Sequence, residues 1–170
     1  MTWNLITQVT QPSDATTLTA NFTNVDFADV SCFVISFQGT DGIATQGSTI
    51  QIGTSSGVLT SDYDLQSIYV GDTSGGLPAS PSYYGFVNGG AWYINNSWGD
   101  NSSFPMIYLW SNAVTDKPQC SMMSGNETTW TGMSGWIDQT LTALGEVVIT
   151  GVSSNNILAD SRLQVYKVTK

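Results

Sequence analysis

The sequence predicts an all-β protein, an antiparallel β-sandwich with a jelly-roll-like arrangement of about seven to ten short strands. Apolar and polar residues alternate with a period of two in many short segments, which is the pattern of half-buried strands. Only 10% of the residues are charged, whereas about 25% is usual for a globular protein. Ser, Thr, Asn, Gln and Gly supply the polarity instead, and these residues suit strand faces and turns.

Individual strands follow from this alternation. In residues 18–23 every second residue is apolar. Residues 30–38 form a longer apolar strand, in which Phe33, Ile35 and Phe37 are expected to share one face. Further strands are expected at residues 48–53, 66–70, 91–95, 106–111, 119–124, 146–150 and 162–168. Clusters of Gly, Asn, Asp and Ser between these segments read as turns.

The chain is expected to form one β-sandwich domain that spans residues 1–170. No stretch rich in Pro, Gly or Ser is long enough to divide it. The best helix candidate is residues 138–144, but it is short and contains three Thr or Gln residues. No helix is therefore predicted.

The first twelve residues form a possible anchoring strand or arm. Trp3, Leu5, Ile6 and Val9 are its large apolar side chains, and they are the candidate residues for docking on a partner protein. The plainer interpretation is an edge strand of the protein's own sheet. The segment 1–4 lacks the basic start and apolar stretch of a signal peptide, so synthesis in the cytoplasm is expected. No apolar run approaches the roughly 20 residues of a membrane span.

Charge narrows the range of partners. The formal net charge is −9, and a surface of that sign repels phosphate backbones and anionic lipids. Nucleic-acid and membrane partners are therefore not expected. The basic residues are Lys117, Arg162, Lys167 and Lys170. The acidity serves solubility or, alternatively, docking onto a basic partner surface.

The chain contains few of the residue types that commonly act as catalytic groups. The chain contains no histidine, which removes the commonest general base, the Ser-His-Asp arrangement and most zinc sites. Glu127 and Glu146 are the only glutamates available for a glycosidase-like carboxylate pair. Asp62 and Asp64 flank Tyr63 as a weak calcium pattern, for which a solvated turn is the simpler explanation. No catalytic, cofactor-binding or metal-ligating residue is therefore assigned.

The two cysteines, Cys32 and Cys120, have no metal-ligand spacing and are expected to be free thiols, with a mutual disulfide as the alternative.

Clustered aromatic residues suggest a second type of site. Trp92, Trp98 and Trp110 lie within one short stretch and are the candidates for stacking on sugar rings. Against this, Trp92 alternates with Ile94 as core residues would, and so does Tyr108 with Trp110, so packing in the core is the competing interpretation.

From about residue 14 onward the chain resembles β-modules in structural proteins of tailed phages, especially tail fibres and virion surface proteins. The segments on which this resemblance rests are LTANFTNV at 18–25, STIQI at 48–52, SSG at 55–57 and SDY at 61–63. The ending carries most of the resemblance, with GW at 135–136, VVIT at 147–150 and SRLQVYKV at 161–168.

The resemblance implies a non-enzymatic structural protein of a phage particle, located on the surface of the virion. Such modules look like jelly rolls that often form homotrimers, and their last strand closes the sheet. Tail fibres usually carry an N-terminal attachment region or shaft, whereas here the β-module starts almost at once. This difference favours a capsid decoration or cement protein bound to the major capsid protein. The alternative is a tail-fibre or receptor-binding module that recognises a host surface glycan.

Overall fold

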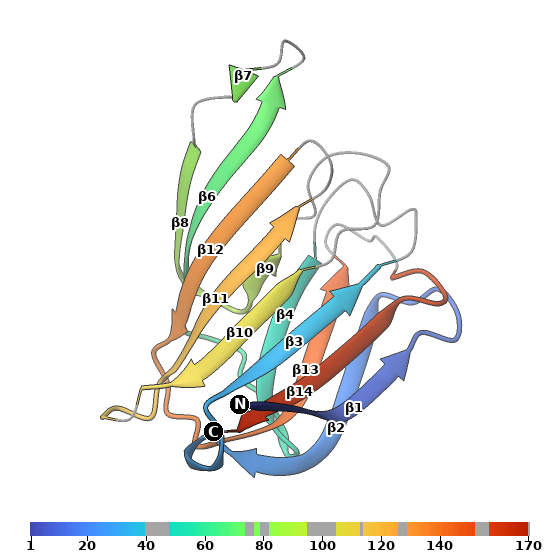
Figure 1. Ribbon diagram of the computed structural model, residues 1–170, viewed down its shortest axis with the longest axis vertical. Helices are drawn as coiled ribbons and strands as arrows, with labels where there is room; N and C mark the ends of the chain where they lie inside the picture. Colours follow the sequence, from blue (N-terminus) through green and yellow to red (C-terminus); the bar gives the residue numbers. More distant parts are fainter. Residues whose placement is uncertain are drawn as a thin grey trace.

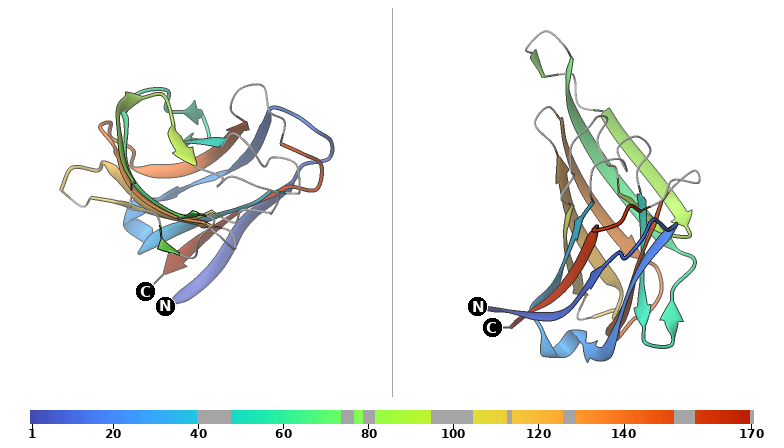
Figure 2. Two further views of the ribbon diagram at one scale, coloured as in Figure 1. Left: turned by 90° about the horizontal axis from the view of Figure 1, so that it is seen from above. Right: turned by 90° about the vertical axis from the view of Figure 1, so that its right-hand side faces the viewer.

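Two antiparallel sheets face each other in the computed structural model of the chain (Figure 1). The structure describes residues 1–39, 48–73, 77–78, 82–94, 105–112, 114–125, 129–151 and 157–169. Figure 2 shows the sheets as two layers, with the two chain ends at the same corner. Strand pairing explains this position, because Thr2 pairs with Thr169 across neighbouring strands.

The larger sheet has nine strands in the order β1-β14-β3-β10-β11-β12-β6-β7, and β8 also pairs with β6. Their bounds are β1 Thr2–Thr10, β14 Arg162–Thr169, β3 Cys32–Gln38, β10 Met106–Ser111, β11 Pro118–Gly125, β12 Thr129–Ile137, β6 Tyr63–Thr73, β7 Leu77–Pro78 and β8 Ser82–Gly89.

The smaller sheet has five strands in the order β2-β13-β4-β5, and β9 also pairs with β4. Their bounds are β2 Thr17–Asp26, β13 Ala143–Gly151, β4 Ser48–Thr54, β5 Gly57–Val58 and β9 Trp92–Ile94. A short 3-10 turn at Phe27–Asp29 follows β2. In the described residues, no helix is long and apolar enough to cross a bilayer.

The predicted all-β antiparallel sandwich is confirmed. Pairing between distant parts of the chain is nested: β1 pairs with β14 in the larger sheet, and β2 pairs with β13 in the smaller one. Such nested pairing of early strands with late strands, in both sheets, is the connectivity of jelly-roll-like folds. The last strand, β14, lies between β1 and β3 and is therefore an interior strand.

The described residues contain fourteen strands, more than the seven to ten expected. Several expected segments lie inside longer strands, and the expected segment 91–95 is the short strand β9. β8 and β12 are full strands that the sequence analysis did not predict, and β5 and β7 are additional pieces of two residues each. Residues 138–144 are not helical, in agreement with the sequence analysis, and their last two residues begin β13.

The core lies between the sheets. Phe33, Ile35 and Phe37 of β3 are fully buried in it, as their alternation predicted. Ile50 and Ile52 of β4 belong to the same buried cluster. Burying these side chains removes apolar surface from water, which provides the main stabilisation of the sandwich.

Candidate functional site

The outer face of the larger sheet, turned away from the smaller sheet, is the candidate functional surface. Six neighbouring strands, β1, β14, β3, β10, β11 and β12, contain no Asp or Glu. Their only charged side chains are the basic Arg162 and Lys167, although the whole chain carries a formal charge of −9. The carboxylates are thus segregated away from this part of the sheet. We call it the acid-free sheet region.

One edge of this region carries the N-terminal patch, formed by the exposed side chains of Met1, Trp3 and Leu5 together with the half-buried Tyr166. Met1 is 91% exposed, Trp3 48% and Leu5 52%. Leu5 pairs with Tyr166 across β1 and β14. The rings of Trp3 and Tyr166 lie 6.0 Å apart at an interplanar angle of 56°. These contacts hold the patch to the end of the sheet.

A β-bulge in β1 divides the four residues expected to dock on a partner. The register with β14 shifts between Leu5 and Thr7, so Ile6 is an extra residue in β1. Ile6 and Val9 pack against the protein's own core. Trp3 and Leu5 instead stay exposed. The structure therefore leaves Trp3 and Leu5 as the docking candidates, while Ile6 and Val9 stabilise the sandwich.

The N-terminal segment is an edge strand, which was its plainer interpretation. β1 ends the strand order of the larger sheet, and only one of its sides pairs with another strand of that sheet. An edge of this kind presents backbone donors and acceptors to a partner.

The three tryptophans proposed to stack on sugars have different positions. Trp92 is 0% exposed, and its Nε1 donates hydrogen bonds to the backbone oxygens of Asp64 at 3.0 Å and Trp136 at 3.4 Å. A ring without exposed surface does not stack on a sugar, so the core interpretation is correct for Trp92. Trp98 lies outside the described residues. The core interpretation is wrong for Tyr108 and Trp110, because Ile107 and Leu109 take the inward positions of β10. Trp110 is half-buried on the outer face and donates from Nε1 to Gln119 Oε1 at 3.0 Å.

Trp136 is an exposed tryptophan that the sequence pattern did not indicate as a stacking residue. It is 38% exposed on β12, between the buried residues Gly135 and Ile137. Register places Trp110, Gln119 and Trp136 side by side across β10, β11 and β12. The alternation of Met133, Gly135 and Ile137 was the available signal, but a glycine at an inward position conceals the apolar pattern.

Comparisons with known proteins gave no match. Neither protein-family models, nor curated proteins, nor solved structures matched this chain.

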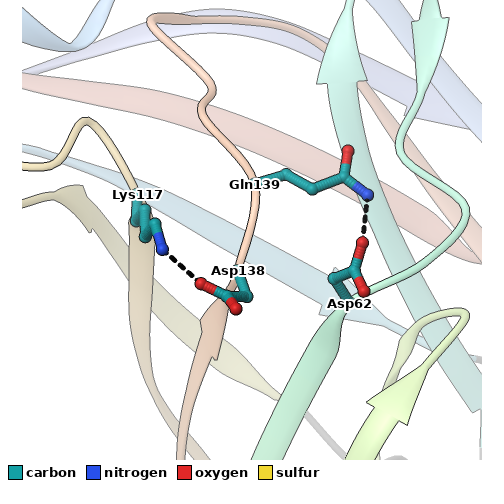
Figure 3. A network of polar contacts seen from close by, with 4 residues as sticks. All are labelled: Asp62, Lys117, Asp138 and Gln139. Carbon is teal, nitrogen blue, oxygen red and sulfur yellow. Dashed lines mark hydrogen bonds and ion pairs between the residues drawn. The ribbon is translucent and has the colours of Figure 1, made fainter.

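A polar network joins three connections at one end of the sandwich (Figure 3). Lys117 forms an ion pair with Asp138, and Gln139 Nε2 donates to Asp62 Oδ2 at 2.6 Å. The Ser61 hydroxyl donates to the same carboxylate oxygen at 2.7 Å. Hydrogen bonds from Ser61 and Gln139 lower the pKa of Asp62 because they stabilise its charged form.

This network explains the acidic pattern around Tyr63 as a turn. Asp62 has a φ of 64°, in the left-handed region that Asp tolerates better than most residues, and it is the last turn residue before β6 begins at Tyr63. Asp64 follows on β6 as a buried residue. Within the described ranges, no three His, Cys, Asp or Glu residues are grouped to hold a metal ion. Of the two glutamates, Glu146 is half-buried on β13, and Glu127 lies outside the described residues.

Both cysteines are free thiols, as expected. Cys120 is buried in the core, where Gly135 is its neighbour across β11 and β12. Cys32 shares the outer face of β3 with Val34, opposite to the core residues. The two thiols thus point to opposite sides of the sheet. Burial raises the pKa of both, to about 12 for Cys120.

Proposed function

We propose that this chain is a non-enzymatic structural subunit of a bacteriophage particle, attached to another virion protein through the N-terminal patch. The observation that carries the proposal is the exposure of Trp3 and Leu5 on an edge strand of the acid-free sheet region. Large aromatic and aliphatic side chains in a region without carboxylates are typical of the centre of a protein interface. Trp residues also contribute a large share of binding energy where they are buried on association.

The proposed position is the capsid exterior, as a decoration or cement protein. The strands around the patch contain no carboxylate, and Arg162 of β14 lies on their outer face, although the whole chain carries a formal charge of −9. An acidic protein surface can therefore approach this edge without meeting the repulsion that the other carboxylates would create. A homotrimer, implied by the resemblance to phage modules, stays a prediction that sedimentation analysis of the purified chain tests.

Point substitutions test the proposal better than deletion of the first ten residues. β1 pairs with β14 along nearly its whole length, and Ile6 and Val9 pack on the core. Deletion would therefore expose β14 and part of the core, and a loss of binding would have two explanations.

The experiment measures co-sedimentation of the chain with phage particles that lack it. The double variant Trp3→Ala/Leu5→Ala is compared with the wild type and with Trp136→Ala, a control that removes another partly exposed tryptophan from the same sheet. We expect the double variant to lose at least about 100-fold in affinity, which corresponds to about 2.7 kcal/mol, and the control to bind normally. Equal binding by the double variant would contradict the proposal.

Electron cryomicroscopy of the reconstituted particles then gives the position. Regular density on the capsid supports a decoration protein. Density confined to the tail would contradict the decoration role and support the alternative, a tail-fibre module.

A further inference from the structure

A second feature of the acid-free sheet region lies several strands away from the N-terminal patch, on β10, β11 and β12. Three rows of outward side chains cross these strands at successive outward positions. The first row contains Trp110, Gln119 and Trp136, the second Tyr108, Ser121 and Ser134, and the third Met106, Met123 and Gly132. Ser121 thus lies between Gln119 and Met123 on its strand, and Ser134 lies between Trp136 and Gly132 on the next strand.

The exposures of these side chains agree with an open polar row. Ser121 and Ser134 are exposed, as is Gln66, which continues the row on β6. Trp136 borders the row at 38% exposure and Met123 borders it on the other side at 52%. The centre of this surface therefore consists of neutral hydrogen-bonding groups, and its borders are apolar.

The hydrogen bond between Trp110 and Gln119 orients the amide at the centre of the first row. An indole N–H can only donate, so the group that faces it at 3.0 Å must be the amide oxygen of Gln119. The amide NH₂ consequently points away from Trp110. Trp136 is the next residue of the row, about 10 Å from Trp110 at the usual strand spacing. A donor of fixed direction thus lies between two indole rings.

From this arrangement we infer that β10, β11 and β12 carry a binding site for a neutral oligosaccharide, which lies along the serine row and stacks on Trp136. A sugar presents apolar C–H faces, which suit an exposed indole, and hydroxyl groups, which suit Ser and Gln side chains. Charge favours a neutral ligand, because these three strands contain no ionisable acid or base apart from Tyr108 and Cys120, and the Lys117–Asp138 ion pair just beyond the first row has no net charge. The nearest carboxylate along the first row is the buried Asp64.

A protein partner fits this part of the sheet less well. An apolar protein surface placed over Ser121 and Ser134 would remove their hydroxyls from water without replacing those hydrogen bonds, which costs free energy for each group. A sugar replaces them with its own hydroxyls. The site is also separate from the N-terminal patch, so the inference does not depend on attachment to a virion.

The test is titration of the purified chain with neutral oligosaccharides of the gluco-, galacto-, manno- and N-acetylglucosamine series, followed by calorimetry and tryptophan fluorescence. At least one series is expected to bind. Trp136→Ala should weaken that binding at least about tenfold, since stacking buries roughly 60 Å² of apolar surface. Ser134→Leu, which fills the row, should weaken it similarly, while Trp3→Ala should leave it unchanged.

Three results would overturn the inference. The first is no binding by any neutral series up to about 10 mM, which means a binding free energy weaker than about −2.7 kcal/mol. The second is wild-type affinity in Trp136→Ala. The third is a change of oligomeric state in that variant, which would identify the surface as a contact between copies. Unfolding curves for Trp136→Ala and Ser134→Leu establish that both variants are folded. Failure of this test leaves the proposed attachment to particles unaffected, because the two proposed binding surfaces consist of different residues.

Discussion

The rings of Tyr63 and Trp92 meet edge to face, 5.2 Å apart at 89°, and each side chain hydrogen-bonds to the backbone of the opposite sheet. Tyr63 belongs to β6 of the larger sheet, and its hydroxyl accepts a hydrogen bond from the Ile52 N–H of β4 at 2.9 Å. Trp92 belongs to β9 of the smaller sheet and donates to the Asp64 carbonyl of β6 at 3.0 Å. The pair therefore connects the two layers by directional bonds as well as by packing.

Replacing Tyr63 by Phe tests this connection. The substitution keeps the ring but leaves the buried Ile52 N–H without its acceptor, so we expect the free energy of unfolding to fall by about 1–3 kcal/mol. Urea unfolding followed by tryptophan fluorescence measures it. The control is Tyr166→Phe on the outer face, which should change stability by less than about 0.5 kcal/mol. Equal effects of the two variants would rule out the proposed role of the Tyr63 hydroxyl.

Gly135 is expected to be intolerant of any side chain. A Cβ atom at this position would lie 2.7 Å from Trp92 Nε1, 2.9 Å from the Asp64 carbonyl oxygen and 3.1 Å from Cys120 Sγ. Gly135→Ala should therefore destabilise the protein by about 1–3 kcal/mol through overpacking. Thermal unfolding measures the loss, with the exposed neighbour Ser134→Ala as the control. An unchanged melting temperature would mean that Trp92 moves aside at no cost.

Stability should decrease in alkaline solution, and Cys120 should cause part of the decrease. In the unfolded chain this thiol ionises near its ordinary pKa of 9.0, whereas burial raises the folded pKa to about 12. Between these values the unfolded state loses a proton that the folded state keeps, so the free energy of unfolding falls by at most about 1.4 kcal/mol per pH unit. The stabilising contribution is complete below pH 9 and is lost as the pH rises towards 12.

The measurement is urea unfolding at several pH values from 7 to 10.5, for the wild type and Cys120→Ala. The variant should show a smaller decrease between pH 9 and 10.5, each protein being referred to its own stability at pH 7. Burial also raises the pKa of Tyr63, so some decrease persists in the variant. Identical slopes would show that the Cys120 thiol ionises as readily in the folded protein as in the unfolded chain.

Asp62 should titrate below its ordinary pKa of 3.8. Ser61 is the larger cause and Gln139 the second, so Ser61→Ala and Gln139→Leu should each raise the pKa of Asp62, the former by more. Carboxyl NMR titration measures these shifts. Gln164→Leu is a matched control, because this glutamine donates to Gln8 in the β1–β14 pair. The stability contributed by Asp62 is present above its ordinary pKa and is lost as the pH falls through the folded value.

The strands with strict alternation were predictable from the sequence, and so was the sandwich. Phe33, Ile35 and Phe37 occupy the core because a period of two assigns every second side chain to the same face. Val34 shows the limit of that rule. It lies on the opposite face of β3 but is 0% exposed. Its cross-strand neighbours are Tyr108 and Tyr166, whose large rings extend the cover of the sheet on that side.

By itself, the sequence determined the all-β class and the scarcity of charge. The strand order of the structure brings the strands without carboxylates together in one sheet region. Only the tertiary structure decided which tryptophans are accessible. Trp92 is enclosed because Gly135, from a strand distant in sequence, leaves room for its indole ring, whereas Trp136 faces outward on that same strand. The bulge at Ile6 likewise separates Ile6 and Val9 from Trp3 and Leu5. Pairing and register between distant segments set these positions, and no local pattern contains that information.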